Sequence, residues 1–419
     1  MARLDFIFFE PTVPSLDEFN ELVWTSDDQA IPRIPQIFWE DGNGWDEANL
    51  WALEKLAAGT VDMETVKRLM KHLLRYAQFL ESKGYDWRHF PIRRDEQPLR
   101  KFRKHLIDER DDGSLAASTA TSCMGAVIQF YRFVSLHNLV ENQIPMWVDK
   151  RVVIPFFDSA GFQRTIVRTS SDLAIPNRRR VGNVLEDGLL PVRSEHMGEL
   201  LTYSRQHETE ELSKMLSVGF FTGARLGTIV TLTLTSLLTV RHDSRARGVY
   251  LLPAGPGTGI STKFSVNGDL MVPEALLVDL RAYASSTERL KREAKAKKPY
   301  KNVLFLNKNG RPYTVDSVGS LVREMRTRAV ASGLNFMHQF KFHQSRATFG
   351  TWLMELLLEL MKPAEAVRIV KEAMFHKREQ TTFGYITFLK DTRAKTEAAD
   401  AFNEAFTGYR NMNWDNKHE

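Results

Sequence analysis

Apolar side chains recur at helical spacing between residues 61 and 83, which is the clearest pattern in the chain. One face of the predicted helix consists of Val66, Leu69, Met70, Leu73, Ala77 and Leu80. Gly84 follows as a helix stop signal. Two more helices are expected, one over residues 99–109 and one that begins with Ser118 as its N-cap. Residues 49–148 are therefore predicted to form a small all-helical domain.

Three other segments lack this periodicity. Residues 1–48 are rich in Pro, Asp and aromatic residues and are predicted to be an N-terminal arm. Prolines and the run Arg178, Arg179 and Arg180 interrupt residues 149–189, which are predicted to be a basic interdomain linker that could follow a phosphate backbone. Residues 392–419 are predicted to be a C-terminal tail, which could dock on a neighbouring copy or on its own domain.

Residues 190–391 combine helical segments with one stretch of strand pattern. Helices are expected after Ser194, over residues 212–220, after Val315, and over residues 345–360, 363–374 and 381–389. Residues 248–253, 259–266 and 269–273 alternate or are β-branched, which predicts a small antiparallel sheet. We therefore expect a multidomain, mainly α protein in which the all-helical domain is followed by an α/β domain.

Composition fits a folded protein with a polyanionic partner. The 419 residues are 43% hydrophobic, and 57 Lys and Arg against 52 Asp and Glu give a formal net charge of +5. Cys123 is the only cysteine, so neither an internal disulfide nor a cysteine zinc site can form. The longest apolar stretch, residues 352–361, is interrupted by Glu355 and Glu359, so we expect a cytoplasmic protein without a membrane partner.

Four short motifs in a fixed order carry the candidate chemistry. They are Thr222-Gly-Ala-Arg225, Lys263 in the predicted hairpin, His343-Gln-Ser-Arg346, and His376 followed nine positions later by Tyr385. A single His-x-x-Arg means little, because the same spacing occurs at His72 and His242. The order and spacing of all four together are what is specific.

With these motifs, the chain resembles the tyrosine recombinase, or phage integrase, family of DNA-cutting and rejoining enzymes. The resemblance covers residues 49–148 as a SAM-like core-binding domain and residues 190–391 as the catalytic domain, which together would form a C-shaped DNA clamp. It implies that Tyr385 is the covalent nucleophile, that His343 assists proton movement, and that His376 hydrogen-bonds the scissile phosphate. It also implies that Lys263 protonates the leaving 5′ oxygen. Lys263 is preferred to the lysines of residues 291–301 because of its hairpin position.

The chemistry of phosphoryl transfer explains why such residues would converge. The phosphorus passes through a state whose non-bridging oxygens carry concentrated negative charge. Arg225 and Arg346 suit that state, because guanidinium groups donate paired hydrogen bonds and stay charged. The phenol of Tyr385 has an ordinary pKa near ~10, so it needs a base or a positive field in order to attack. A phosphotyrosine conserves the energy of the broken bond, so we expect no cofactor, metal or ATP.

Three positions depart from the family pattern. Thr228 stands where the family usually has an acidic residue, Phe375 where it usually has Gly, and Ala347 where a histidine is common. These changes suggest a divergent branch.

The resemblance implies double-stranded DNA core sites as partners, four copies assembled on two sites, integration or excision of a mobile element, and room for accessory proteins. Two alternatives stay open. One is a type IB topoisomerase or a hairpin-forming strand transferase with the same residue set. The other is a DNA-binding protein that keeps the fold without cutting.

Overall fold

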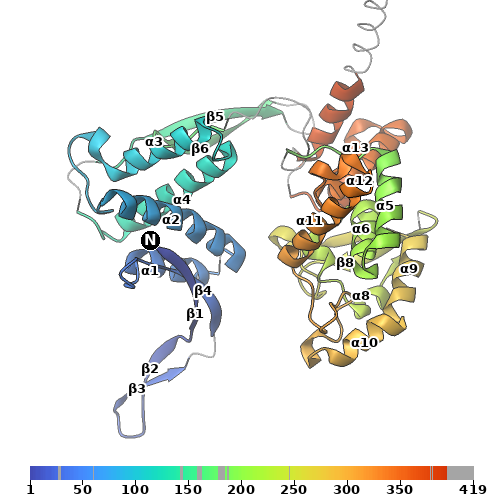
Figure 1. Ribbon diagram of the computed structural model, residues 1–419, viewed down its shortest axis with the longest axis horizontal. Coiled ribbons are helices and arrows are strands. Elements are labelled where there is room, and N and C mark those ends of the chain that lie inside the picture. The colour runs from blue at the N-terminus through green and yellow to red at the C-terminus, as the bar shows by residue number, and fades with distance from the viewer. Residues whose placement is uncertain are drawn as a thin grey trace, which may run out of the picture. The chain divides into compact units, whose positions relative to one another are not determined.

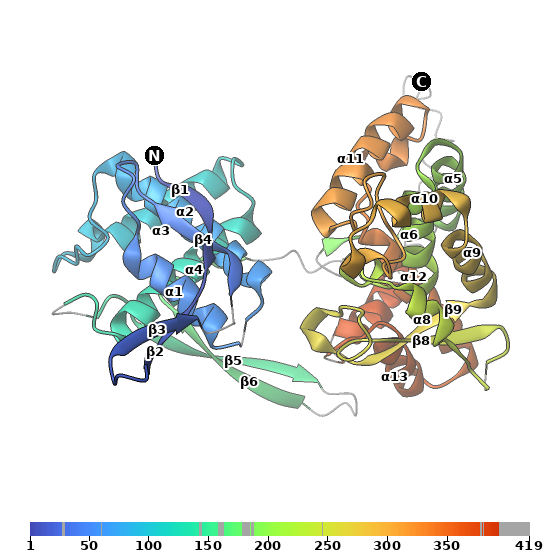
Figure 2. The same ribbon diagram turned by 90° about the horizontal axis from the view of Figure 1, so that it is seen from below.

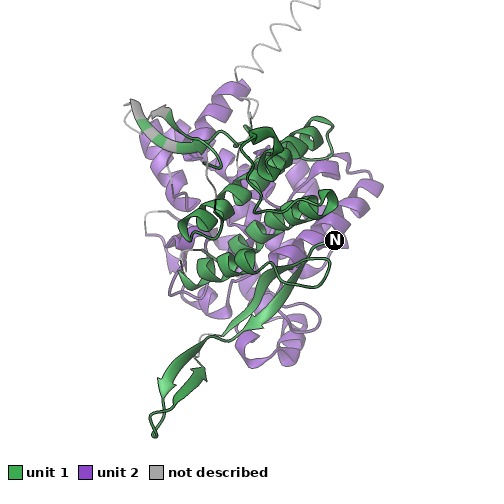
Figure 3. Ribbon diagram, turned by 90° about the vertical axis from the view of Figure 1, so that its left-hand side faces the viewer, with its two compact units in different colours: residues 1–156, 165–180 green, residues 157–164, 181–419 purple. Residues whose placement is uncertain are grey.

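The computed structural model describes residues 1–26, 30–59, 61–141, 145–157, 163–177, 185, 188–244, 246–377, 379 and 381–393. The chain divides into two compact units (Figure 3). Unit 1 comprises residues 1–156 and 165–180, and unit 2 comprises residues 157–164 and 181–419. Both are mainly helical with small antiparallel sheets, of which only the sheet of unit 2 was expected. Within the described residues, no helix is both long and apolar enough to cross a bilayer.

Four helices form the body of unit 1, namely α1 (Asp46–Ala57), α2 (Met63–Lys83), α3 (Pro98–Asp111) and α4 (Ala117–Leu136). The predicted end of α2 is confirmed, because Gly84 ends the helix with a φ of 63°. The helix begins two residues later than predicted, at Met63, where Asp62 caps the first turn by accepting from the Thr65 amide at 2.7 Å. The predicted cap of α4 is wrong, because α4 begins at Ala117 and Ala116 occupies the N-cap position.

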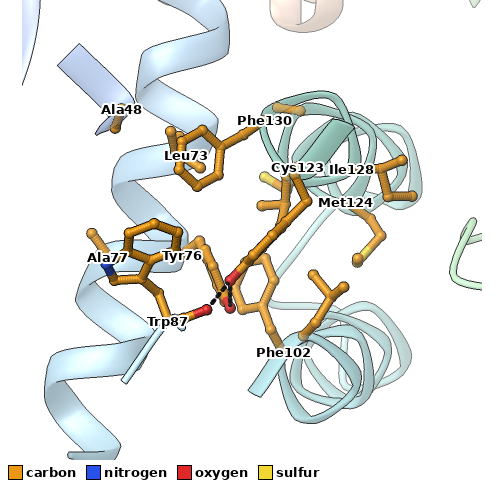
Figure 4. Packing of buried hydrophobic residues seen from close by; sticks show 14 of the residues in the cluster. Ala48, Leu73, Tyr76, Ala77, Trp87, Phe102, Cys123, Met124, Ile128 and Phe130 are labelled. Atoms are coloured by element: carbon orange, nitrogen blue, oxygen red, sulfur yellow. Dashed lines mark hydrogen bonds between the residues drawn. The ribbon is translucent and has the colours of Figure 1, made fainter. Parts of the chain in front are cut away.

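Aromatic rings fill the space between these helices. The hydroxyls of Tyr76 and Tyr131 are 2.8 Å apart, and Tyr131 donates to the Trp87 carbonyl at 2.7 Å (Figure 4). Phe102 and Phe130 pack beside them and are fully buried. The two phenols are thus satisfied inside an apolar core.

The segment expected to be an arm forms a β-ribbon. Strand β1 (Arg3–Phe9) pairs with β4 (Ile31–Phe38), and β2 (Thr12–Leu16) pairs with β3 (Leu22–Ser26) (Figure 1). Its base belongs to the core of unit 1, because Ile37 is fully buried and its backbone exchanges hydrogen bonds with the Asn49 side chain. Prolines and irregular alternation hid these strands from the sequence pattern.

The predicted linker also contains regular structure. Strands β5 (Asp149–Phe157) and β6 (Gln163–Ser171) form a two-stranded sheet. The three arginines Arg178, Arg179 and Arg180 lie outside the described residues.

Unit 2 begins with the helices α5 (Ser194–His207), α6 (Glu210–Thr222), α7 (Leu226–Ile229) and α8 (Leu234–Leu238). The helices that follow the sheet are α9 (Glu274–Ala284), α10 (Thr287–Lys295), α11 (Val315–Ala331), α12 (Gln344–Leu360) and α13 (Pro363–Ala373). Residues 381–393 are helical as well. The helices of residues 315–331, 344–360 and 363–373 agree with the expected ranges.

The sheet of unit 2 has the order β7 (Arg241–His242), β8 (Val249–Ala254) and β9 (Gly268–Pro273), all antiparallel. The strand expected over residues 259–266 is absent. These residues form the connection from β8 to β9, with a short 3₁₀ turn, η3 (Lys263–Ser265), in place of the strand. Backbone conformations with positive φ at Phe264 (65°) and Ser265 (51°) prevent a regular strand there.

Helix α12 runs beside α6 and α13, and α13 packs against β9 (Figure 2). The α6–α12 crossing is close because of small residues: a Cβ at Gly219 would lie 2.6 Å from the Ser345 Oγ. Two apolar clusters result, one around α6, β8, β9 and α11 and one around α12, α13 and Tyr385. Phe375, next to His376, belongs to the first cluster, and Tyr385 and Ala347, next to Arg346, belong to the second.

Candidate active site

The first motif forms the turn that ends α6. Gly223 is the C-cap residue with a φ of 65°, and a Cβ there would lie 2.3 Å from the Phe349 ring. Only glycine satisfies both the left-handed backbone and this close packing. The turn delivers Arg225, half-buried, to the N-cap position of α7.

The His343-Gln-Ser-Arg346 motif forms the start of α12, with His343 at the N-cap position and Arg346 three residues later. Arg346 is only 2% exposed, and its Nη1 donates to the Gly223 carbonyl at 2.6 Å. Its Nη2 donates to the Met374 carbonyl. One side chain therefore connects the start of α12 to the Thr222–Arg225 turn and to the turn before His376.

Both of these acceptors are neutral backbone carbonyls. They orient the guanidinium without cancelling its positive charge, and a guanidinium has five N–H donors. Positive charge held in a buried, preorganised position is what an anionic transition state requires.

The motif that begins with His376 follows α13 in a tight turn. The His376 amide donates to the Lys371 carbonyl at 2.9 Å, and Phe375 has a φ of 50°. The Phe375 ring is buried against Gly268 of β9, where a Cβ would lie 2.5 Å from the ring. The turn thus holds His376 between the sheet and α12.

His376 is 5% exposed, and its Nδ1 lies 2.9 Å from the Thr382 hydroxyl. Tyr385, on the helix of residues 381–393, is fully buried, and its ring stacks on that of His376 with centroids 6.1 Å apart. The Tyr385 ring also lies against Gly350 of α12, where a Cβ would come within 2.6 Å of it. The structure brings His376, Tyr385 and α12 into one packed cluster.

Lys263 lies in the β8–β9 connection, and its side chain is exposed. Its Nζ lies 5.2 Å from the centre of the Phe264 ring, and the Nζ of Lys377 lies 5.8 Å from the same centre. The Ser261 amide donates to the Thr231 hydroxyl at 3.0 Å, just beyond α7. The connection that carries Lys263 therefore contacts both the His376 turn and the segment after Arg225.

Sequence reasoning missed a basic pocket near the start of α12. Arg326, His338, Lys341 and Gln344 line a pocket of about 390 Å³, and Arg326 donates to the His338 carbonyl. Arg328, two residues further along α11, is instead paired with Glu208 at 2.6 Å. The periodicity of α11 gives no sign of this pocket, because His338 lies in a separate short helix, η5 (Asn335–Gln339), and Lys341 follows that helix.

Among the described residues, no group of three His, Cys, Asp or Glu side chains is placed to hold a metal ion.

Thr228, which stands where an acidic residue was expected, is buried in α7, and its amide donates to the Arg225 carbonyl at 2.9 Å. Residues 394–419 of the predicted tail lie outside the described part of the chain.

No known family model matches the sequence, and no curated protein matches it. Among solved structures, the chain is similar to a fragment of the Tn1549 transposon integrase in complex with transposon right end DNA, with 16% identity and a TM-score of 0.49, over 84% of this chain and 98% of that one. It is also similar to a λ integrase dimer bound to a COC′ core site, with 11% identity and a TM-score of 0.46, over 79% of this chain and 91% of that one. A λ integrase tetramer bound to a Holliday junction is similar with 11% identity and a TM-score of 0.44, over 78% of this chain and 75% of that one. The chain is thus similar to solved integrases at low identity, and its function has to be inferred from the site itself.

Proposed function

We propose that this protein is a site-specific tyrosine recombinase that cleaves and rejoins DNA through a 3′-phosphotyrosine on Tyr385. The observation that carries the proposal is the pair of contacts made by Arg346, to the Gly223 and Met374 carbonyls. Those contacts join motifs more than a hundred residues apart around His376 and Tyr385. A buried guanidinium is costly to desolvate, and an anionic substrate bound beside it would offset that cost.

In the proposed reaction, the Tyr385 oxygen attacks the scissile phosphorus and the 5′ oxygen of the next nucleotide leaves. Arg225 and Arg346 would stabilise the negative charge of the pentacoordinate state. His343 would take up the phenolic proton, His376 would hydrogen-bond the phosphate, and Lys263 would protonate the leaving oxygen. Religation reverses these steps with a new 5′ hydroxyl, so the reaction as proposed consumes no ATP.

The burial of Tyr385 adds a requirement to this mechanism. A DNA phosphodiester cannot reach a phenol that is 0% exposed and packed between His376 and Gly350. The helix of residues 381–393 must therefore move before attack, and the phenol cannot react while it stays in this core.

The partners that follow from the proposal are double-stranded DNA core sites and other copies of the chain, four of them on two sites, in the service of a mobile element. The basic pocket of Arg326, His338 and Lys341 and the exposed Lys263 are positive surfaces near the site. Binding through such contacts should weaken steeply as salt rises. A cytoplasmic location and the use of accessory proteins belong to the same proposal.

A nicked suicide substrate tests the proposal directly. With DNA that carries a target site, the protein should form a covalent protein–DNA adduct that Tyr385→Phe abolishes, because the phenol is the only group that forms the bond. Tyr250→Phe, on β8 in the same unit, is the matched control and should keep the adduct. The mechanism would be ruled out if Tyr385→Phe still formed the adduct, as Tyr250→Phe should. It would also be ruled out if the wild type formed no adduct.

The same assay separates the two alternatives. A non-cutting DNA-binding protein forms no adduct with any substrate. A type IB topoisomerase forms the adduct and relaxes a supercoiled plasmid but does not exchange strands between two sites, whereas a recombinase yields exchanged products from a two-site plasmid.

A further inference from the structure

The hairpin of β2 and β3 does not pack on a layer of described helices or strands. Figure 1 shows it projecting from the helices of unit 1, and Figure 3 shows the same from another side. Its register pairs Leu16 with Leu22 and Pro14 with Trp24, so these four side chains share one face. Leu22 is 62% exposed and Trp24 is 61% exposed.

An isolated two-stranded hairpin is at best marginally stable in water. Exposed apolar residues that gather on one element mark an interaction surface, unlike those scattered singly. Phe19, at the tip of this hairpin, is 82% exposed. The Asp17 carboxylate holds the tip in shape by accepting from the amides of Phe19 and Glu21, each at 2.9 Å. The hairpin is thus an ordered element that presents apolar side chains to a partner.

The charge of the hairpin indicates the kind of partner. Residues 10–26 contain Glu10, Asp17, Glu18 and Glu21 and no Lys or Arg. None of these carboxylates forms an ion pair with another described residue. An acidic, apolar surface repels the phosphates of nucleic acid. It fits a protein surface that is both basic and apolar.

The chain itself carries such a surface. After α10, the short helix η4 (Lys298–Tyr300) and the residues that flank it present exposed Lys297, Lys298 and Lys301. Among the described residues, these three lysines have no carboxylate partner. Leu290 (51% exposed) and Tyr300 (40% exposed) add apolar area beside them. We call residues 290–301 the α10 surface.

The α10 surface is also rigidly supported. Arg289 is fully buried and donates to the carbonyls of Lys301 and Val303, at 3.0 and 2.8 Å. Arg292 is paired at 2.5 Å with Glu211, whose side chain is 1% exposed. A docking surface held in this way loses little conformational freedom when a partner binds.

We propose that the β2–β3 hairpin of one copy docks on the α10 surface of a second copy. The proposal goes beyond the proposed function and does not depend on it, because it concerns self-association with or without catalysis. The two surfaces differ, so the contact is heterologous, and successive contacts can close into a ring of copies.

Charge reversal tests the pairing. Sedimentation velocity of the purified full-length protein at low salt should show self-association. Glu18→Lys/Glu21→Lys and Lys297→Glu/Lys298→Glu should each raise the dissociation constant by about tenfold or more, because each places like charges together. The protein with all four changes should regain association, because the pairing is restored with reversed sign. Glu355→Lys/Glu359→Lys on α12 is the control, with the same change in net charge as the Glu18→Lys/Glu21→Lys variant, and should associate like the wild type.

A failure of the fourfold variant to recover, with circular dichroism like that of the wild type, would overturn the pairing. So would an equal loss in the control. Absence of self-association by the wild type over the whole accessible concentration range would overturn the proposal as well.

Crosslinking identifies the contact independently. A photoreactive benzoylphenylalanine in place of Phe19, in a mixture of light and ¹⁵N-labelled protein, should give crosslinked peptides of mixed isotope that join residue 19 to residues 287–311. Crosslinks within one chain, to another surface of the second copy, or to added DNA would each contradict the proposal.

Discussion

Phe375 occupies a backbone conformation that favours glycine. Its φ of 50° costs a non-glycine residue about 1 kcal/mol or more, yet its ring is buried against Gly268. The strain is therefore offset by packing between the His376 turn and β9. This explains how the chain tolerates Phe at a position where its resemblance to tyrosine recombinases leads one to expect Gly.

The contact predicts a coupling between the two positions. Gly268→Ala should destabilise unit 2 by about 1–3 kcal/mol, because its Cβ would overlap the Phe375 ring. The same change in a Phe375→Gly background should cost much less, since the overlapping ring is gone. Urea unfolding of the four proteins measures the interaction energy. Simple additivity of the two changes would contradict the packing argument.

His72 predicts a pH dependence for unit 1. Burial, and then the charges of Arg68 and Arg75, hold the pKa of His72 below its ordinary value of 6.5. Well above pH 6.5 the His72 imidazole is neutral in both the folded and the unfolded chain. As the pH falls, the imidazole of the unfolded chain takes up a proton first, because its pKa is higher. The unfolding free energy should therefore fall with decreasing pH below 6.5, and less steeply in His72→Gln.

Denaturant titrations at several pH values give this slope. His89→Gln, which replaces an exposed histidine of the same unit, serves as the control. An identical slope in His72→Gln and the wild type would refute the assignment.

At the scale of elements, the crossing of α6 and α12 positions the candidate site. Gly219 lets Ser345 approach, and the next residue along α12 is Arg346. The same crossing brings the Gly223 carbonyl to the Arg346 guanidinium. The distance between two helices thus sets the position of a charged group proposed to bind phosphate.

Gly219→Ala should separate stability from catalysis. Its Cβ would overlap the Ser345 Oγ and push α12 away, with a stability cost of about 1–3 kcal/mol. Adduct formation on the suicide substrate should fall more than stability explains, because a displacement of Arg346 weakens transition-state contacts.

Leu277→Ala, in the buried face of α9, is the comparison, with an expected cost of about 2–5 kcal/mol and little effect on the adduct at low temperature. If both variants lost adduct formation in proportion to stability, the positioning role of the crossing would be disproved.

At the scale of the whole molecule, the two units have separate cores. One apolar cluster lies entirely between residues 2 and 175, and the other two lie between residues 185 and 388. Separate cores are what independent folding requires.

We therefore expect fragments of residues 1–177 and 185–419 each to unfold cooperatively. Thermal melts followed by circular dichroism test this, with the full chain as reference. Fragments that melt without a transition, while the full chain melts in a single one, would show that the units fold only together.

The sequence by itself determined those helices whose periodicity and end signals lie within the helix or next to it. The periodicity of residues 66–80 and the stop at Gly84 predict α2 without reference to the rest of the chain. Segments whose stability comes from pairing with distant residues escaped the same reasoning. Strands β1 and β4, for example, pair across more than twenty residues and form the base of the ribbon.

The candidate site divides in the same way. Motif order and spacing singled out Arg225, Lys263, His343, Arg346, His376 and Tyr385, because phosphoryl transfer limits the residue types that serve it. Only the tertiary structure decided that Arg346 holds the Gly223 and Met374 carbonyls and that Tyr385 is buried against Gly350. Contacts between distant segments depend on how helices cross, and no local pattern encodes a crossing.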